Sequence, residues 1–334
     1  MKNIFKAFYF ITAALLITSC NKSDDSTTEL KDYSEQYQKD LELIEDFLQT
    51  HYMEVTNNPG ATDDQSVTFT EIPTGGTQTS IWNQTDYPLQ VRYVNKHDIT
   101  YKLYYIQLRQ GTGASSQSPC NVDQVLASYN GKYIYTDSDT EKTTFEQFEE
   151  SLNPQTYFSL ASVIAGWSEI FPKFKTGSYS ANPDGTISYF DFGAGIMFIP
   201  SGLGYYNVST GGIPSYSPLI FSFKLYEIIR EDQDGDGIPS YQEDISTVVV
   251  NSDGTETVIN GTPDGYVRVL DEGVVNPDDT DGDEIPDFLD VDDDGDYFTT
   301  LSEIKNPLTG DSYPYDQIPT CTDGKKKHLS TACH

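Results

Sequence analysis

The chain has 334 residues, enough for two domains, and carries 52 acidic against 20 basic side chains, a formal net charge of −32. Such a charge would repel nucleic acid and anionic lipid head groups and would attract divalent cations, so we expect no nucleic-acid partner. Most of the excess lies between Glu231 and Glu303, where 23 carboxylates accompany a single basic residue, Arg268. The acidity of that segment therefore needs a local explanation.

The first twenty residues, MKNIFKAFYFITAALLITSC, are predicted to be an export signal. Two lysines precede an apolar run that is too short for a stable membrane span, and small residues follow it. The ending ITSC resembles the lipobox of bacterial lipoproteins, which implies cleavage directly before Cys20 and acyl chains on Cys20 that anchor the protein in the lipid bilayer. The alternative is an ordinary signal peptide with an incidental cysteine.

Residues 21–32 are predicted to form a linker behind the acylated cysteine. Their acidic pair, Asp24-Asp25, resembles the surface-export signal of lipoproteins in some Gram-negative bacteria. We therefore expect an outer-membrane lipoprotein, either surface-exposed or facing the periplasm. The alternative for the acidic pair is a solvated linker without a targeting role.

A helix is predicted from Tyr33 to Met53, because apolar side chains recur there at helical spacing between charged and polar ones. These apolar positions are Tyr37, Leu41, Ile44 and Leu48. The turn signal NNPG at 57–60 should follow the end of the helix. Residues 33–87 would thus comprise a helix and loops with one short strand.

Strand-like runs dominate from Leu89 onwards and are separated by Pro, Gly and Asn. One short helix is predicted among them, beginning near Leu160 and covering Ile164 to Phe174. Strands around a single helix favour an α+β domain over residues 88–229. An acidic segment at 230–303 and a tail at 304–334 follow it.

Several blocks within this domain resemble the FKBP-type peptidyl-prolyl isomerases, in the order of that family. VLASYNG at 125–131 resembles the strand V-x-V-x-Y-x-G, and FSLASVIAGW at 158–167 matches F-x-L-x-x-V-I-x-G-W. IPSGLGY at 199–205 resembles the segment before the pocket tyrosine. GIP at 212–214 with LIFSFKL at 219–225 resembles the closing loop and last strand, and GTG at 111–113 fits the lead-in. The resemblance covers about residues 100–229.

The resemblance implies an FKBP-like antiparallel sheet wrapped around a short helix, and an apolar pocket for proline. Trp167 would be the pocket floor, and the backbone N–H of Ile164 would hold the carbonyl before the substrate proline. The alternative is that these residues are simply core aromatics of a β-rich domain. The implied lining comprises Tyr129, Tyr135, Phe158, Val163, Ile164, Trp167, Tyr205, Ile213 and Phe221.

The implied reaction needs no nucleophile, general base or cofactor. The barrier to X–Pro rotation is the partial double bond of the imide, and a polar solvent favours its planar, charge-separated form. An apolar pocket removes that advantage as the bond twists. The substrates would be proline-containing polypeptides among exported or outer-membrane proteins.

Two features depart from the family pattern. The family has an aromatic residue followed directly by Asp, as F-D-S-S, at the pocket rim, and we assign this rim to Tyr135-Thr136-Asp137-Ser138, with Thr136 where Asp is expected. Asp137 would substitute through a one-residue bulge, or the rim is altered. Residues 178–195 form an insertion whose turn signal, NPDG at 182–185, predicts a hairpin near the pocket.

The acidic segment contains three loops with the ligand spacing of calcium-binding EF-hands. The first, DQDGDGIPSYQE at 232–243, has oxygen side chains at positions one, three, five, nine and twelve and Gly at six. Loops starting at Asp279 and Asp292 repeat this, with Glu284 and Tyr297 at position six. Tandem units of this kind resemble thrombospondin type 3 repeats. We expect structural calcium; the alternative is an acidic solvated linker. The candidate ligands, counting three backbone carbonyls, are Asp232, Asp234, Asp236, Ile238, Glu243, Asp279, Asp281, Asp283, Ile285, Asp287, Asp290, Asp292, Asp294, Asp296, Phe298 and Glu303.

Between the first two loops, residues 247–250, 255–259 and 266–270 are predicted to be short strands. In the tail, Cys321 and Cys333 are predicted to form a disulfide in an oxidising compartment. The alternative is a zinc site using both cysteines with His328 and His334, although their spacing matches no zinc motif. Cys120 would be a buried free thiol.

Two classes of function follow from these features. The first is a prolyl isomerase that assists the folding of exported proteins. The second is a non-catalytic binding subunit, in which the FKBP-like domain docks on an outer-membrane complex and the calcium segment is a spacer. The set of pocket aromatics favours the first class, whereas the assigned rim and the insertion favour the second.

Overall fold

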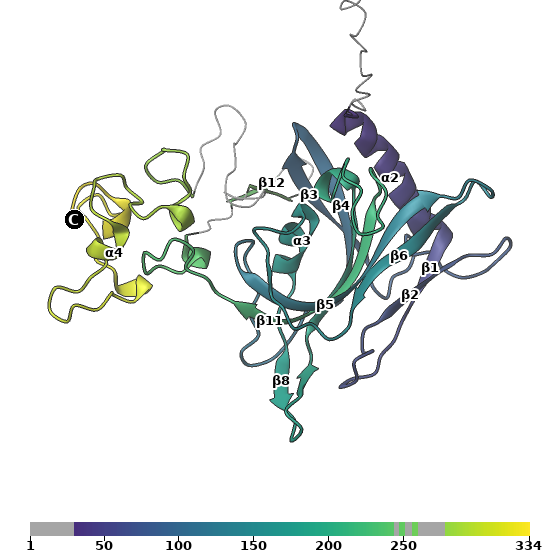
Figure 1. Ribbon diagram of the computed structural model, residues 1–334, viewed down its shortest axis with the longest axis horizontal. Helices are drawn as coiled ribbons and strands as arrows, with labels where there is room; N and C mark the ends of the chain where they lie inside the picture. The colour runs from purple at the N-terminus through teal and green to yellow at the C-terminus, as the bar shows by residue number, and fades with distance from the viewer. Residues whose placement is uncertain (1–29, 244–246, 251–255, 260–277) are drawn as a thin grey trace, which may run out of the picture. The chain divides into compact units, whose positions relative to one another are not determined.

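The computed structural model describes residues 30–243, 247–250, 256–259 and 278–334 (Figure 1). The predicted signal, Cys20, the acidic pair at 24–25 and the predicted strand at 266–270 lie outside the described residues. Residues Asp32–His334 form one compact unit. Among the described residues, no helix combines the length and the apolar character that crossing a membrane requires.

A nine-stranded, almost entirely antiparallel sheet dominates the unit, which confirms the α+β class. Its order is β12-β13-β3-β4-β10-β11-β5-β6, and β7 pairs with β5. Their bounds are β3 (Leu89–Lys96), β4 (Ile99–Arg109), β5 (Gln124–Thr136), β6 (Thr143–Ser151), β7 (Phe158–Ser159), β10 (Gly193–Ile199), β11 (Leu219–Ile229), β12 (Thr247–Val250) and β13 (Glu256–Ile259). The strands predicted at 247–250 and 255–259 are thus present, and β13 meets β3 through a single parallel pairing.

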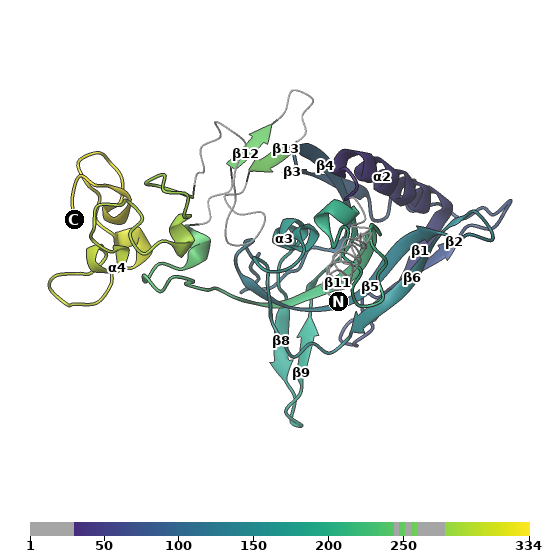
Figure 2. The same ribbon diagram turned by 45° about the horizontal axis from the view of Figure 1, so that its top comes forward.

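Helices cover both faces of the sheet (Figures 1 and 2). On one face, α3 (Ala165–Ile170) and the 3-10 turn η1 (Phe171–Lys173) pack on Leu103 of β4 and Met197 of β10. On the other, α2 (Tyr33–Thr50) packs on Tyr104 and Phe198. Neighbouring residues of one strand serve opposite faces because strand side chains alternate. Since both faces are buried, all seven residues of β10 are buried.

The N-terminal helix is three residues shorter than the sequence predicts. It begins after the cap Asp32, whose side chain accepts a hydrogen bond from the Glu35 N–H, and it ends at Thr50. His51–Val55 is instead the strand β1, paired with β2 (Val67–Glu71) in a two-stranded sheet. Cross-strand pairing, which the helical periodicity cannot report, decides this boundary.

The helix α3 is also shorter than predicted, because Leu160 to Val163 form turns and Ile164 is the extended residue that precedes it. Gly166 lets α3 lie close to β10: a Cβ there would stand 2.6 Å from the Ile199 side chain. The family motif V-I-x-G-W therefore places Trp167 directly against the sheet.

The predicted insertion is a hairpin, with β8 (Ser178–Ala181) paired to β9 (Ile187–Phe190). Both strands project from the sheet in Figures 1 and 2. Gly185 takes a positive φ of 86° in the turn, as the NPDG signal leads us to expect.

The acidic loops and the tail share a small apolar core of Ile238, Ile304 and Ile318, against which Tyr313 and Tyr315 pack. Short helical turns support the loops: η3 (Ser240–Gln242), η4 (Asp287–Leu289), α4 (Thr300–Glu303), η5 (Tyr315–Gln317) and η6 (Lys327–Leu329). The first loop and the third thus contribute to one core although they are far apart in the sequence.

Candidate functional site

An aromatic cavity of about 240 Å³ opens beside α3. Its lining includes seven of the nine residues that we predicted to line the proline pocket, and three residues that we did not predict. The predicted ones are Tyr129, Phe158, Val163, Ile164, Trp167, Tyr205 and Phe221, and the additional ones are Phe148, Glu149 and Ser162. They come from β5, β6, β7, α3, β11 and the loops at 162–164 and 205, so only the folded sheet assembles them.

Trp167 lies at the centre of the aromatic cluster, as expected for a pocket floor. It is 4% exposed, and three rings stand edge-on to it. The ring centroids of Tyr129, Phe158 and Phe221 lie 5.2, 5.5 and 5.3 Å from that of Trp167. These distances and the near-perpendicular planes are favourable for aromatic pairs, so the walls are rigid.

The pocket rim lies at Phe148-Glu149 and not at Tyr135-Thr136-Asp137, so our assignment of the rim is wrong. Phe148 and Glu149 line the cavity, whereas Tyr135 and Asp137 do not. The family pattern F-D-S-S resembles FEES at 148–151, with Glu149 in place of Asp and Glu150 in place of the first Ser. The sequence contains this resemblance, but we assigned the rim to Tyr-Thr-Asp-Ser at 135–138, which lies closer along the chain to the Y-x-G strand.

Asp137 has a local structural role at the β5–β6 turn. Its Oδ1 accepts hydrogen bonds from the Asp139 N–H at 3.1 Å and from the N–H and hydroxyl of Thr140 at 2.8 and 2.9 Å. These bonds lower the pKa of Asp137. Tyr135 packs against Tyr133, and Ile213 is buried in the core. None of the three predicted residues Tyr135, Asp137 and Ile213 reaches the lining.

Phe148 can approach the pocket because position 131 is glycine. A Cβ on Gly131 would stand 2.5 Å from Phe148 Cζ and 3.0 Å from Phe221. The Gly of the family's Y-x-G strand therefore leaves room for the rim aromatic of the adjacent strand. Burial, and to a lesser extent a hydrogen bond to Glu149, raises the pKa of the Tyr129 hydroxyl. This hydrogen bond connects Glu149 to Tyr129 in the wall of the cavity.

Two hydrogen-bond donors at the cavity are left without a partner within the described ranges. The indole Nε1 of Trp167 is buried and unbonded. The backbone N–H of Ile164, extended at φ −60° and ψ 142°, donates to no described carbonyl. The unsatisfied indole N–H is costly because it is buried, whereas Ile164 is only half-buried. Both residues belong to the lining of the cavity.

The orientation of α3 depends on a buried ion pair. Arg92 of β3 donates from Nε to Oε2 of Glu169, 2.8 Å away, and the two side chains are 7% and 4% exposed. Glu169 lies two residues after Trp167 on the same helix. The pair thus fixes α3 to the sheet, and loss of one partner would leave an unpaired buried charge.

The inserted hairpin does not line the aromatic cavity, so our prediction of a pocket-side insertion is wrong. Its residues 185–189 line a different hollow of about 620 Å³, together with Tyr157 and Tyr226. The hydroxyls of Tyr157 and Tyr189 both donate to Glu227 there, at 2.5 and 2.7 Å. The hairpin residues 178–190 therefore contribute nothing to the lining of the aromatic cavity.

The three acidic loops share one backbone geometry. The first Asp of the first two loops accepts N–H bonds from the residues three and five positions on, as in Asp232 with Gly235 and Gly237 at 2.8 and 3.1 Å. In the third loop Asp292 accepts from Tyr297 at 3.0 Å. Position six has a positive φ in all three loops, so Glu284 and Tyr297 take the left-handed conformation that Gly237 adopts without strain.

Carboxylates converge at positions one, three and five of each loop. Their ligand oxygens lie within 4.8 Å of one another in each of three groups. The groups are Asp232, Asp234 and Asp236, then Asp279, Asp281 and Asp283, and then Asp292, Asp294 and Asp296. Neither Asp287 nor Asp290 belongs to such a group; Asp287 instead accepts bonds from the N–H and hydroxyl of Thr280.

The first and third loops fit a divalent cation better than the second. Asp234, Asp236, Glu243, Asp294 and Glu303 each bury a carboxylate oxygen that has no partner in the described chain. Burial and neighbouring carboxylates raise the pKa of Asp234 to about 7 and that of Glu303 to about 8. A hard cation would relieve both penalties with the oxygen ligands that calcium prefers. In the second loop, by contrast, Asp281 and Asp283 are exposed.

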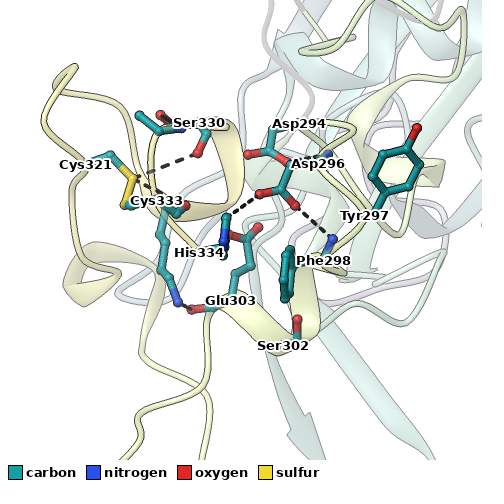
Figure 3. A network of polar contacts seen from close by, with 12 residues as sticks. Asp294, Asp296, Tyr297, Phe298, Ser302, Glu303, Cys321, Ser330, Cys333 and His334 are labelled. Carbon is teal, nitrogen blue, oxygen red and sulfur yellow. Dashed lines mark hydrogen bonds and ion pairs between the residues drawn. A yellow bond between two sulfur atoms is a disulfide. The ribbon is translucent and has the colours of Figure 1, made fainter.

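Figure 3 shows the third loop against the C-terminal tail. His334 lies 2.8 Å from Asp296 Oδ2 through its Nδ1, and its ring stacks on Phe298 at 4.2 Å. We predicted that Ile238, Ile285 and Phe298 each supply a backbone carbonyl oxygen as a calcium ligand. The side chains of Ile285 and Phe298 are exposed, whereas the side chain of Ile238 is buried.

The tail cysteines Cys321 and Cys333 are joined in a disulfide, the pairing favoured by the sequence over a zinc site. Their Cα atoms are 5.8 Å apart. Because both sulfurs are bonded, neither is available to zinc. His328, the third residue of that alternative, is buried, and burial lowers its pKa to about 4. Cys120 is not in a disulfide and is of intermediate exposure, less buried than expected.

Comparisons with known proteins divide the chain at the end of the sheet domain. A family model described as BamM C-terminal matches residues 233–328, the acidic loops and tail. No curated protein matches the sequence. Among solved structures, the chain is similar to a peptidyl-prolyl cis-trans isomerase from Pseudomonas syringae pv. tomato, with 23% identity over 41% of this chain and 80% of that one, at a TM-score of 0.29.

Two further solved structures are each similar over 38% of the chain. FkpA from Escherichia coli is 27% identical over 38% of this chain and 48% of its own, about half its length, at a TM-score of 0.27. The N-terminal domain of FKBP42 from Arabidopsis thaliana is 11% identical over 38% and 86%, also at 0.27.

Proposed function

We propose that the chain is an FKBP-type peptidyl-prolyl cis-trans isomerase that acts on X–Pro bonds of exported or outer-membrane polypeptides. The observation that carries the proposal is the convergence of Tyr129, Phe158, Trp167 and Phe221 on one open cavity, with the unbonded Ile164 N–H in its lining. Its volume of about 240 Å³ is enough for a proline ring and the bonds on either side.

In this mechanism the proline ring lies on Trp167 between the aromatic walls. The Ile164 N–H holds the carbonyl before the proline, so the rest of the substrate rotates about a fixed end. The planar imide is favoured by water because it is charge-separated, and the apolar walls withdraw that advantage as the bond twists. No bond is made or broken, so no nucleophile or proton carrier is required.

The rim residues have a supporting role in this proposal. Phe148 closes the side of the cavity at Gly131, and Glu149 holds the Tyr129 hydroxyl. Because Glu149 retains the acid of the family's rim, the position of Thr136 no longer argues against catalysis. Two differences from the family pattern remain: the acid is longer by one methylene, and Glu150 stands where the family has Ser.

A second candidate is a docking subunit of an outer-membrane (BAM) complex. It is favoured by the match of residues 233–328 to the BamM C-terminal model. We propose that the acidic loops bind structural calcium, and that acyl chains on Cys20 hold the chain at the outer membrane, so both functions could operate at the same place. Catalysis and docking would then use different parts of the chain.

The test is acceleration of cis-trans exchange in a short X–Pro peptide, followed by NMR exchange spectroscopy, with the soluble chain from residue 21, which lacks the acylation site Cys20. The uncatalysed reaction takes tens of seconds. Trp167→Ala should abolish most of the acceleration. Trp82→Ala, the other tryptophan, is the control, because Trp82 is 37% exposed and does not line the cavity.

Because Trp167→Ala could unfold the domain, Tyr205→Ala provides a second variant at the 37% exposed mouth of the pocket. It should bind the peptide more weakly while the chain stays folded. A folded wild-type chain that binds the peptide without accelerating exchange would refute catalysis and favour the docking subunit. A folded wild-type chain that does not bind the peptide would refute the proline pocket itself.

A further inference from the structure

Three buried carboxylates meet between the first and third acidic loops. Asp236 and Glu243 belong to the first loop, whereas Asp293 lies in the third loop at an even position that the loop spacing does not assign as a ligand. One oxygen from each lies within 4.8 Å of the others. The three residues are 2%, 4% and 1% exposed, so this group is the most deeply buried of the acidic groups in the described chain.

The oxygens of this group lack partners. Asp236 Oδ2, both carboxylate oxygens of Glu243 and both of Asp293 are buried and accept no hydrogen bond from the described residues. Like charges in a dry site are strongly unfavourable unless a counter-charge is present.

The surrounding fold nevertheless holds the two loops together. Ile238 of the first loop packs with Ile304, which directly follows the third loop, and with Ile318 of the tail. The hydroxyl of Tyr315 donates to the carbonyl of Gln242 at 3.2 Å, next to Glu243. An apolar core therefore holds together three carboxylates that repel each other when ionised, and either protons or a bound cation would relieve this repulsion.

The carboxylate of Asp293 belongs to a different group from the carboxylates of the residues on either side of it. Asp292 and Asp294 belong to the third loop's own group, whereas the side chain of Asp293 belongs to the group with Asp236 and Glu243. Two adjacent carboxylate groups are thus supplied by consecutive residues. The N–H of Asp293 bonds to the buried hydroxyl of Thr300 at 3.3 Å, which ties its backbone to α4.

We propose that Asp236, Glu243 and Asp293 form one divalent-cation site shared between the first and third loops, with Asp293 as the ligand that connects them. The proposal rests on the calcium binding proposed above and adds its inter-loop ligand. Three carboxylates can offer up to six oxygens, which suits the coordination of calcium better than the strict octahedron of magnesium. The bound ion would join the two ends of the acidic segment.

The test uses calcium alone as the probe, with the calcium-stripped mature chain and isothermal titration calorimetry. Asp293→Asn should remove one calcium per chain or weaken one site at least tenfold. Glu243→Gln, in the other loop, should remove the same site, and the double variant should lose no more than either single variant. Glu284→Gln is the control, because Glu284 is exposed and belongs to none of the groups.

Thermal unfolding separates a ligand from a structural residue. Without calcium, Asp293→Asn should unfold at the same temperature as the wild type or higher, because one buried negative charge is removed. With millimolar calcium its gain in Tm should be smaller than that of the wild type. An equal loss of Tm with and without calcium, or unchanged calcium binding, would overturn the shared site. Additive losses of two separate ions in the double variant would do the same. A wild-type chain that binds no calcium would refute the calcium proposal as a whole.

Discussion

Acidification should stabilise the calcium-free acidic segment, which is the opposite of ordinary acid denaturation. Asp236 and Asp287 are 2% and 3% exposed, and desolvation first, then neighbouring carboxylates, raises the pKa of each from 3.8 to about 6. A raised carboxyl pKa means that the charged form disfavours the folded state. Each group therefore costs about 3 kcal/mol when fully ionised, from a shift of about two units at about 1.4 kcal/mol each.

The cost is relieved as the pH falls through about 6, because the folded carboxyl takes up a proton while the unfolded one stays charged until about 4. Between pH 7 and pH 5 each group should return about 1 kcal/mol of stability. Burial and like charges also raise the pKa of Glu243 and Asp293, which adds stabilisation of the same sign.

Hydrogen-exchange mass spectrometry of the calcium-stripped mature chain measures this locally. Peptides covering 232–243 and 287–304 should exchange roughly tenfold more slowly per protonated group at pH 5 than at pH 7, after correction for intrinsic rates. A peptide covering β10 is the control and should not change. With saturating calcium the trend should reverse, because protons then compete with the ion. Calcium-free loops whose protection falls or stays constant on acidification would refute the reasoning.

Three further outcomes are expected. Arg92→Ala should destabilise the sheet domain by about 3–5 kcal/mol in urea unfolding, because it strands Glu169 as a buried charge; a loss below about 1 kcal/mol would contradict this role. Reduction of the Cys321–Cys333 disulfide should cost roughly 3 kcal/mol of stability in the tail, and unchanged protease resistance of residues 304–334 after reduction would count against it. Cys20→Ser should move the protein from the membrane to the soluble fraction on cell fractionation, and continued membrane retention would refute acylation.

The sequence by itself determined the features that depend on local spacing. The order of the FKBP-like blocks predicted the α+β sheet and seven of the lining residues, because each block carries its own strand or turn and its own aromatic residues. The Asp spacing of the three loops predicted the convergence of positions one, three and five, since loop geometry is set by residues a few positions apart. The tail disulfide was predicted in the same way, from two nearby cysteines and an export signal.

Only the tertiary structure decided which residues meet across long stretches of chain. The rim pair Phe148-Glu149 reaches the pocket because β6 lies beside β5 and Gly131 leaves room, which no single segment records. The hairpin at 178–190 lines the hollow beside Tyr157 and Tyr226, and not the aromatic cavity. The helix α2 covers the second face of the sheet. Asp293 joins the first loop because an apolar core of Ile238, Ile304 and Ile318 brings the loops together. Packing of this kind depends on the summed burial of distant side chains, and local periodicity carries no information about it.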